Sequence, residues 1–191
     1  MEDLNKLFLE ELADVYSAEK QLLKALPKMA KAATSEELRT AFETHLDETE
    51  EQVNRLEQVF ELFGKPAKAK KCEAMEGLIE EGKGVMSDHD ESPVLDAALI
   101  CAAQKIEHYE IATYGTLCTW AELMGNDEAL ELLKETLGEE KETDEKLSEI
   151  AETAINVQAA QGSEGEEEDG GPTGRSSGGS KRSRSDMAEK E

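Results

Sequence analysis

Residues 130–154 read LELLKETLGEEKETDEKLSEIAETA, and this segment gives the clearest evidence for a helical bundle. Its inward positions recur at alternating spacings of three and four, which is the period of one face of an α-helix. That face consists of Leu130, Leu133, Leu137, Glu140, Asp144, Leu147, Ala151 and Ala154. Two carboxylates therefore stand in the middle of a face that should be buried. Because an unpaired buried charge is costly, the pattern calls for a compensating cation, and a metal ion is the leading candidate.

The rest of the chain shows the same helical period, broken by clear start and stop signals. Thr34-Ser35 offers an N-cap for the second helix, where Thr34 with Glu37 fits a capping box, and Ser92-Pro93 is a typical helix start. Gly125-Asn126-Asp127 is a tight turn between helices. We expect five helices, over about residues 3–31, 36–63, 71–86, 93–124 and 127–158.

The order and lengths of these helices predict an all-α protein, a ferritin-like four-helix bundle. Two long helices form each of two antiparallel hairpins, and the short helix at about 71–86 lies in the crossover between them. The bundle is expected over residues 1–161. Residues 162–191 contain EGEEEDGG and GRSSGGSKRSRS, which are too poor in apolar residues to order themselves, so we expect a disordered low-complexity tail.

The formal charge of −24, from 45 acidic and 21 basic residues, argues against nucleic-acid binding by the bundle, because phosphate contacts need clustered Lys and Arg. The chain has no run of 18 apolar residues and no basic-then-apolar leader. We therefore expect no membrane association and a cytoplasmic location.

Acidic residues of the second hairpin stand at matching heights. Helices that fold back on one another place residues equidistant from the turn at the same level. Glu110 precedes Gly125-Asn126 by about as much as Glu140 follows it, and Glu107 likewise matches Asp144. Two stripes of the fourth helix compete for the inward face. One is Ala103, Glu107, Glu110 and Tyr114, and the other is Leu99, Ile106, Tyr109 and Thr113.

The first hairpin repeats this arrangement around its turn near Thr34. Glu19 lies opposite Glu48, with His45 one turn away. Both hairpins thus bring carboxylates to the middle of the bundle. The candidate metal ligands are Glu19, His45, Glu48, Glu107, Glu110, Glu140 and Asp144.

A cluster of carboxylates with one imidazole suits Fe or Mn, whereas structural zinc prefers Cys and His. Two ions per chain, bridged by carboxylates, would explain why so many acids converge. The main hypothesis is therefore a di-metal oxidoreductase that handles peroxide, O₂ or Fe(II). The alternatives are non-catalytic iron sequestration and a metal-free helical scaffold.

Five segments of the chain resemble one known family. They are DVYSAEKQLLKALPKMAKAA, AFETHLDETEEQVNRLEQVF, CEAMEGLIEEG, DAALICAAQKIEHYEIATYGTL and LLKETLGEEKETDEKLSEIA. Through them the chain, over about residues 3–157, is similar to the YciE/YciF family of ferritin-like stress proteins. The resemblance implies a helical bundle, a homodimer and a di-metal centre. Better-known di-iron proteins of this fold use Glu-x-x-His on two helices. This chain instead has His45-x-x-Glu48, and Glu140-x-x-x-Asp144 without a histidine.

Overall fold

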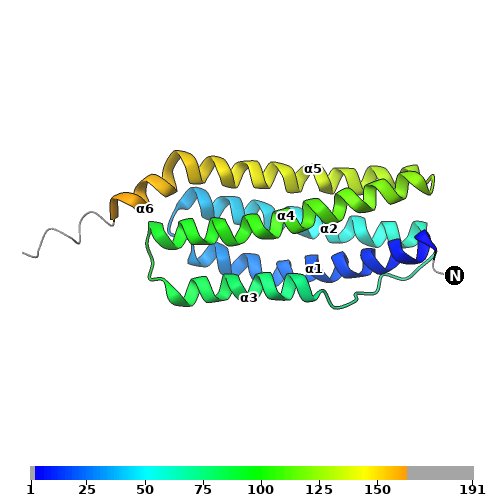
Figure 1. Ribbon diagram of the computed structural model, residues 1–191, viewed down its shortest axis with the longest axis horizontal. Coiled ribbons are helices and arrows are strands. Elements are labelled where there is room, and N and C mark those ends of the chain that lie inside the picture. The colour runs from blue at the N-terminus through cyan, green and yellow to red at the C-terminus, as the bar shows by residue number, and fades with distance from the viewer. Residues whose placement is uncertain (1–2, 163–191) are drawn as a thin grey trace, which may run out of the picture.

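The computed structural model describes residues 3–162, which form helices with no β-strand among them (Figure 1). The helices are α1 (Leu4–Ala32), α2 (Glu36–Leu62), α3 (Glu73–Asp88), α4 (Pro93–Leu123), α5 (Asp127–Ile150) and α6 (Asn156–Gly162), with a π-helical turn, η1 (Ala151–Ile155), between α5 and α6. The predicted tail, residues 162–191, lies outside the described residues except for Gly162. None of the described helices is long and apolar enough to cross a membrane.

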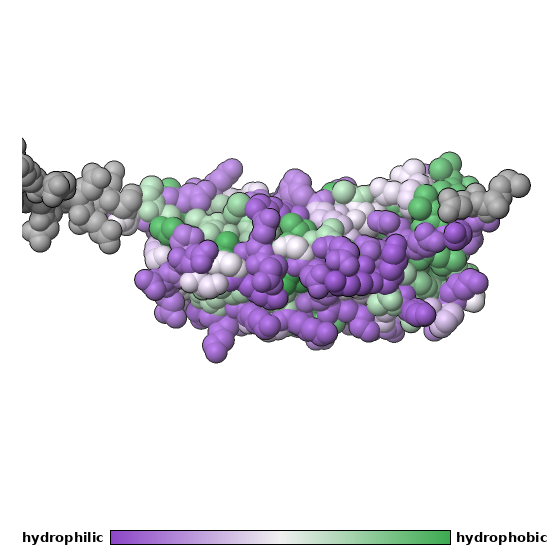
Figure 2. Space-filling view, turned by 60° about the horizontal axis from the view of Figure 1, so that its bottom comes forward, coloured by the Kyte–Doolittle hydropathy of each residue, from purple (hydrophilic) through white to green (hydrophobic). Residues whose placement is uncertain are grey.

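The four long helices lie side by side as two hairpins, which confirms the ferritin-like bundle. Helix α1 packs on α2, α4 packs on α5, and the hairpins meet where α2 contacts α5 and α1 contacts α4. Helix α3 lies in the crossover and packs on the outside of α1 and α4 (Figure 1). Hydrophilic residues cover most of the face that Figure 2 shows, while hydrophobic residues gather at its right-hand end.

Helix boundaries follow from local capping. The side chains of Asp3, Ser92 and Asn126 each accept a hydrogen bond from a backbone N–H in the first turn of α1, α4 and α5. The predicted capping box of Thr34 and Glu37 is wrong, because Ser35 caps α2 instead. The Thr34 hydroxyl is already engaged, since it donates to the carboxylate of Asp96 on α4.

The core consists of two hydrophobic clusters at opposite ends of the bundle. One cluster includes Phe8, Val59 and Leu133, and the other includes Leu22, Leu99 and Leu147. The middle of the bundle is different, because buried polar side chains from all four long helices gather there. They are Glu19, His45, Thr49, Gln52, Glu107, Glu110, Thr113, Thr136 and Glu140.

Helix α4 buries one of the competing stripes and most of the other. Glu107 and Glu110 are buried, and so are Ile106 and Thr113 of the alternative stripe, whereas Tyr109 is half-buried. The reason is its position, because α4 packs against α1, α3, α5 and α6 and so has little free surface. A helix covered on most sides has no single inward face.

The last predicted helix, 127–158, is not continuous. The π-helical turn at Ala151–Ile155 interrupts it. A π-helical turn contains more residues than an α-helical one, so the inward face moves along the chain. Ile155 is therefore buried in the core where the sequence pattern placed Ala154.

Asp96 ties the two hairpins together, and its removal should destabilise the fold. Its buried carboxylate accepts hydrogen bonds from the Thr34 N–H at 2.8 Å and the Ser35 N–H at 2.9 Å, at the start of α2. Because these bonds are made to a charged acceptor beside a helix N-terminus, we expect Asp96→Ala to lower the unfolding free energy by about 2 kcal/mol in urea titrations. The exposed Asp47→Ala is the matched control. Equal stability of the two variants would contradict this role.

Candidate metal centre

Each of the four long helices contributes a buried ionisable side chain to the middle of the bundle. Glu19 comes from α1, His45 from α2, Glu107 and Glu110 from α4, and Glu140 from α5. None of these residues is more than 2% exposed. Glu107 and Glu110 share a face because they are three residues apart on a helix.

Four of these residues form a tight cluster. His45, Glu107, Glu110 and Glu140 each offer one ligand atom, and these four atoms all lie within 4.8 Å of one another. The His45 Nε2 atom lies 3.5 Å from Glu107 Oε1 and 3.8 Å from Glu140 Oε2. Glu110 and Glu140 therefore lie at the same level of the bundle, as their distances from the turn predicted.

The cluster is poor in hydrogen bonds for a buried polar site. Neither oxygen of Glu110 and neither oxygen of Glu140 has a hydrogen-bond partner. Glu107 Oε2 and His45 Nε2 also lack one. Buried polar atoms in native proteins are almost always satisfied, and leaving one unpaired costs about 1–3 kcal/mol. This set of orphaned donor atoms fits a bound cation, which would satisfy several of them together.

Burial dominates the electrostatics of the carboxyl groups. Loss of water, reinforced by neighbouring carboxylates, raises the pKa of Glu110 well above its usual value. Burial also raises the pKa of Glu107, although His45 opposes the shift. For Glu19, burial and the nearby Glu140 raise the pKa to about 8. Without a cation, protons therefore neutralise much of this centre.

The pKa of His45 is also raised, because acidic side chains surround the imidazole. Burial alone would lower its pKa, but Glu107, Glu48 and Glu140 together raise it to about 10. The imidazole is therefore held in its charged form when no metal is bound. A metal ligand must be neutral imidazole, so an ion that binds here displaces this proton.

Glu19 lies beside the four-residue cluster and is oriented by a tyrosine. The Tyr114 hydroxyl donates a short hydrogen bond to Glu19 Oε1, while Glu19 Oε2 has no partner. Both side chains are fully buried. One oxygen of Glu19 is thus fixed and the other remains available.

Two predicted ligands lie elsewhere. Glu48 Oε2 is 3.5 Å from His45 Nδ1, but the Glu48 side chain is 35% exposed and stands outside the four-residue cluster. Asp144 points away from the centre, toward Gln104 at 3.2 Å and the exposed His108 at 3.3 Å. The buried face of α5 runs through Leu133, Thr136, Glu140, Leu147 and Ile150. Asp144 falls beside this face because a strict seven-residue repeat drifts around a 3.6-residue helix.

A clamp between α2 and α5, which the sequence did not reveal, adjoins the cluster. Arg55 donates two hydrogen bonds of 2.6 Å to the carboxylate of Glu139, and Gln52 donates another of 3.1 Å. The Arg55 guanidinium also donates to Thr136 at 3.2 Å. Bidentate pairs of this kind are geometrically specific. Glu139 precedes Glu140, so the clamp fixes the part of α5 that carries a cluster residue.

The donor chemistry suits Fe or Mn. Three carboxylates and one imidazole within a few ångströms are hard and borderline ligands, and Cys is absent from the cluster. Glu19 adds a fourth buried carboxylate next to it. The fold and this cluster together define a ferritin-like helical bundle with a buried carboxylate and imidazole site.

Comparison with known proteins identifies the family. The chain belongs to the family described as domain of unknown function DUF892, whose model matches residues 3–160. The chain is 51% identical over 160 residues to Protein YciF of Escherichia coli (strain K12), across 83% of this chain and 96% of that protein. The resemblance to the YciE/YciF family is thereby confirmed.

Solved structures agree with this assignment. The crystal structure of the E. coli stress protein YciF matches with a TM-score of 0.78 and 52% identity, over 82% of this chain and 99% of that chain. A structure of YcfI from Rhodopseudomonas palustris matches with a TM-score of 0.75 and 43% identity, over 77% and 94% of the two chains.

Replacing Glu110 by an apolar residue should stabilise the metal-free protein. Both of its oxygens are buried and unpartnered, so Glu110→Leu removes a desolvation cost while keeping similar volume. We expect the unfolding free energy in urea with chelator present to rise by about 1–3 kcal/mol. A loss of stability would show that Glu110 is part of a satisfied structural network.

The metal-free protein should lose stability as pH rises from about 5 to 8. In this range folded Glu19, with a pKa of about 8, holds a proton that the unfolded chain, near 4.5, has released. Above pH 6.5, folded His45 likewise holds a proton that the unfolded chain has released, because its pKa in the folded protein is about 10. Unfolding free energy falls with pH wherever the native state holds more protons.

Chelator-treated protein unfolded in urea at several pH values measures this slope. Glu19→Gln should flatten the slope, whereas the exposed Glu10→Gln should leave it unchanged and so controls for the repulsion of the surface charges. A slope that is identical in Glu19→Gln and the wild type would contradict a buried proton at this position.

Proposed function

We propose that this protein binds Fe or Mn at the buried cluster and serves in the redox handling of peroxide, O₂ or Fe(II). The observation that carries this proposal is the set of unpartnered ligand atoms on Glu107, Glu110, Glu140 and His45, which converge where solvent does not reach. A protein that needed these acids only for folding would have paired them with Lys, Arg or backbone donors.

The ligands divide naturally between two ions per chain. Glu107, Glu110, Glu140 and His45 would hold the first ion, and the free Oε2 of Glu19 supplies a donor toward a second. When bound, Fe or Mn exchanges electrons with small oxidants such as O₂ or peroxide. The protein contributes a preorganised, water-poor site, since the two hydrophobic clusters enclose the polar layer from both ends of the bundle.

A neighbouring tyrosine positions one of the ligands. Tyr114 donates a hydrogen bond to one oxygen of Glu19 and leaves the other oxygen free. Metal binding also requires that the carboxyl groups and the Nε2 atom of His45 release their protons.

Metal analysis of purified protein tests the assignment directly. We expect the wild type to retain two Fe or Mn ions per chain and Glu140→Ala to bind at least about tenfold more weakly, since removing even supporting groups of a metal site has such effects. The exposed Glu145→Ala, on the same helix, should match the wild type. Equal metal content in Glu140→Ala and Glu145→Ala would refute the proposed site.

A metal ion that binds only the native state stabilises it, so we expect chelation to lower the melting temperature of the wild type. Glu140→Ala should show little further change with chelator. A wild-type protein that contains no metal and keeps full stability in chelator would favour the metal-free scaffold.

Fe(II) oxidation separates redox function from storage. We expect the wild type and Glu145→Ala to accelerate oxidation of Fe(II) by peroxide or O₂ over protein-free buffer, and Glu140→Ala to lack this activity. Uptake of Fe far beyond two ions per chain, without turnover, would instead indicate iron sequestration.

The homodimer implied by the family resemblance remains a prediction, which light scattering of the purified chain tests.

A further inference from the structure

The buried cluster needs a route by which ions reach it. None of its four residues is more than 2% exposed, so an ion cannot bind directly from solvent. A groove of about 800 Å³ lies between α2 and α5 on the surface. Glu48 and Thr143 line this groove, and both also contact the cluster.

His45 connects the groove to the cluster. Its Nδ1 atom is 3.5 Å from Glu48 Oε2 and 3.4 Å from Thr143 Oγ1, at the inner wall of the groove. Its Nε2 atom faces Glu107 and Glu140 and has no hydrogen-bond partner. One nearly fully buried ring therefore separates the groove from the carboxylates.

The charge of this groove favours cations. Glu36, Glu37, Glu48 and Glu142 line it, and Lys146 is the single basic residue among the lining side chains. Lys146 is neutralised by Glu37 and Glu149, each at 3.0 Å. A cleft lined by one sign of charge concentrates ions of the opposite sign and speeds their arrival.

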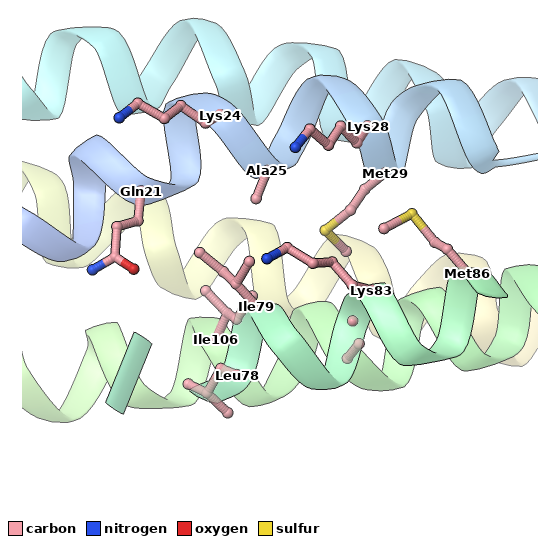
Figure 3. Close-up of a pocket in the computed structure, with 12 residues that line it drawn as sticks. Gln21, Lys24, Ala25, Lys28, Met29, Leu78, Ile79, Lys83, Met86 and Ile106 are labelled. Carbon is pink, nitrogen blue, oxygen red and sulfur yellow. The ribbon is translucent and has the colours of Figure 1, made fainter. Parts of the chain in front are cut away.

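A second groove, between α1, α3 and α4, has the opposite character (Figure 3). Its walls are apolar side chains such as Met29, Ile79 and Met86, and Lys24, Lys28 and Lys83 are its charged residues. No carboxylate lines it. Lysines at a groove repel metal ions, so this surface is a poor entrance to the centre.

We propose that the α2/α5 groove is the entry route for divalent cations and that Glu48 is a transfer ligand, which captures an ion at the surface and passes it beside His45 to Glu107 and Glu140. This inference rests on the proposed metal site and assigns Glu48 to transport of the ion, not to its final coordination. An ion that moves along this route exchanges water for carboxylate oxygens one at a time, with no covalent chemistry.

The kinetics of Co²⁺ loading test the route, because Co²⁺ changes its visible absorption when protein ligands replace water. Metal-free protein is mixed with Co²⁺ in a stopped-flow instrument, and the bound amount is measured at equilibrium. We expect Glu48→Gln to bind as much Co²⁺ as the wild type but at least about tenfold more slowly, as loss of electrostatic focusing predicts. Glu43→Gln makes the same charge change on an exposed part of α2 outside the groove and should load normally.

A second variant changes the charge of the groove without altering Glu48 or Thr143, the two groove residues that contact His45. Thr44 lines the groove and is exposed, so Thr44→Lys adds a positive charge to the path. We expect slower loading with unchanged capacity. We also expect the wild-type rate to fall with ionic strength more steeply than the rates of both groove variants.

Three other outcomes of these loading experiments would contradict the proposed route. Equal loading rates for the wild type, Glu48→Gln and Thr44→Lys would overturn the route while leaving the metal site intact. Reduced Co²⁺ capacity in Glu48→Gln would make Glu48 a permanent ligand and overturn its transfer role. A wild type that takes up no Co²⁺ at equilibrium would overturn the proposed function and the route with it.

Discussion

The burial of several unpaired carboxyl groups at mid-bundle is the main energetic cost that this fold has to meet. Glu107, Glu110 and Glu140 lie within a few ångströms of one another, where water does not reach, and His45 is the only buried basic residue in the part of the chain that the structure describes. Like charges in such a place cannot all remain ionised, so protons or cations must neutralise them. The raised pKa values of Glu110 and His45 express that requirement in the absence of a metal.

The remainder of the fold holds these groups together against their mutual repulsion. The hydrophobic clusters above and below the polar layer supply the apolar burial that stabilises a helical bundle. Two polar ties then join the hairpins: Asp96 holds the start of α2, and the pair of Arg55 and Glu139 holds the middle of α2 against α5. These two sets of hydrogen bonds therefore help to offset the free-energy cost of burying the carboxyl groups.

Much of this arrangement follows from sequence period, and some of it does not. The hairpins and the meeting of Glu110 with Glu140 were predictable, because helix length and turn position fix relative height. The exclusion of Asp144 was missed, because a strict seven-residue repeat drifts around a 3.6-residue helix and leaves Asp144 beside the buried face of α5. The role of Asp96 and the π-helical turn near Ala151 depend on tertiary contacts that no local pattern encodes.

Anomalous diffraction from crystals of the protein grown with Fe or Mn is the decisive test of metal binding at the cluster, because it identifies the element, the number of ions and their place. We expect strong peaks at the centre of the bundle, in direct contact with Glu107, Glu110, Glu140 and His45. Peaks confined to surface carboxylates, or none at all, with the four side chains still converging, would contradict this expectation.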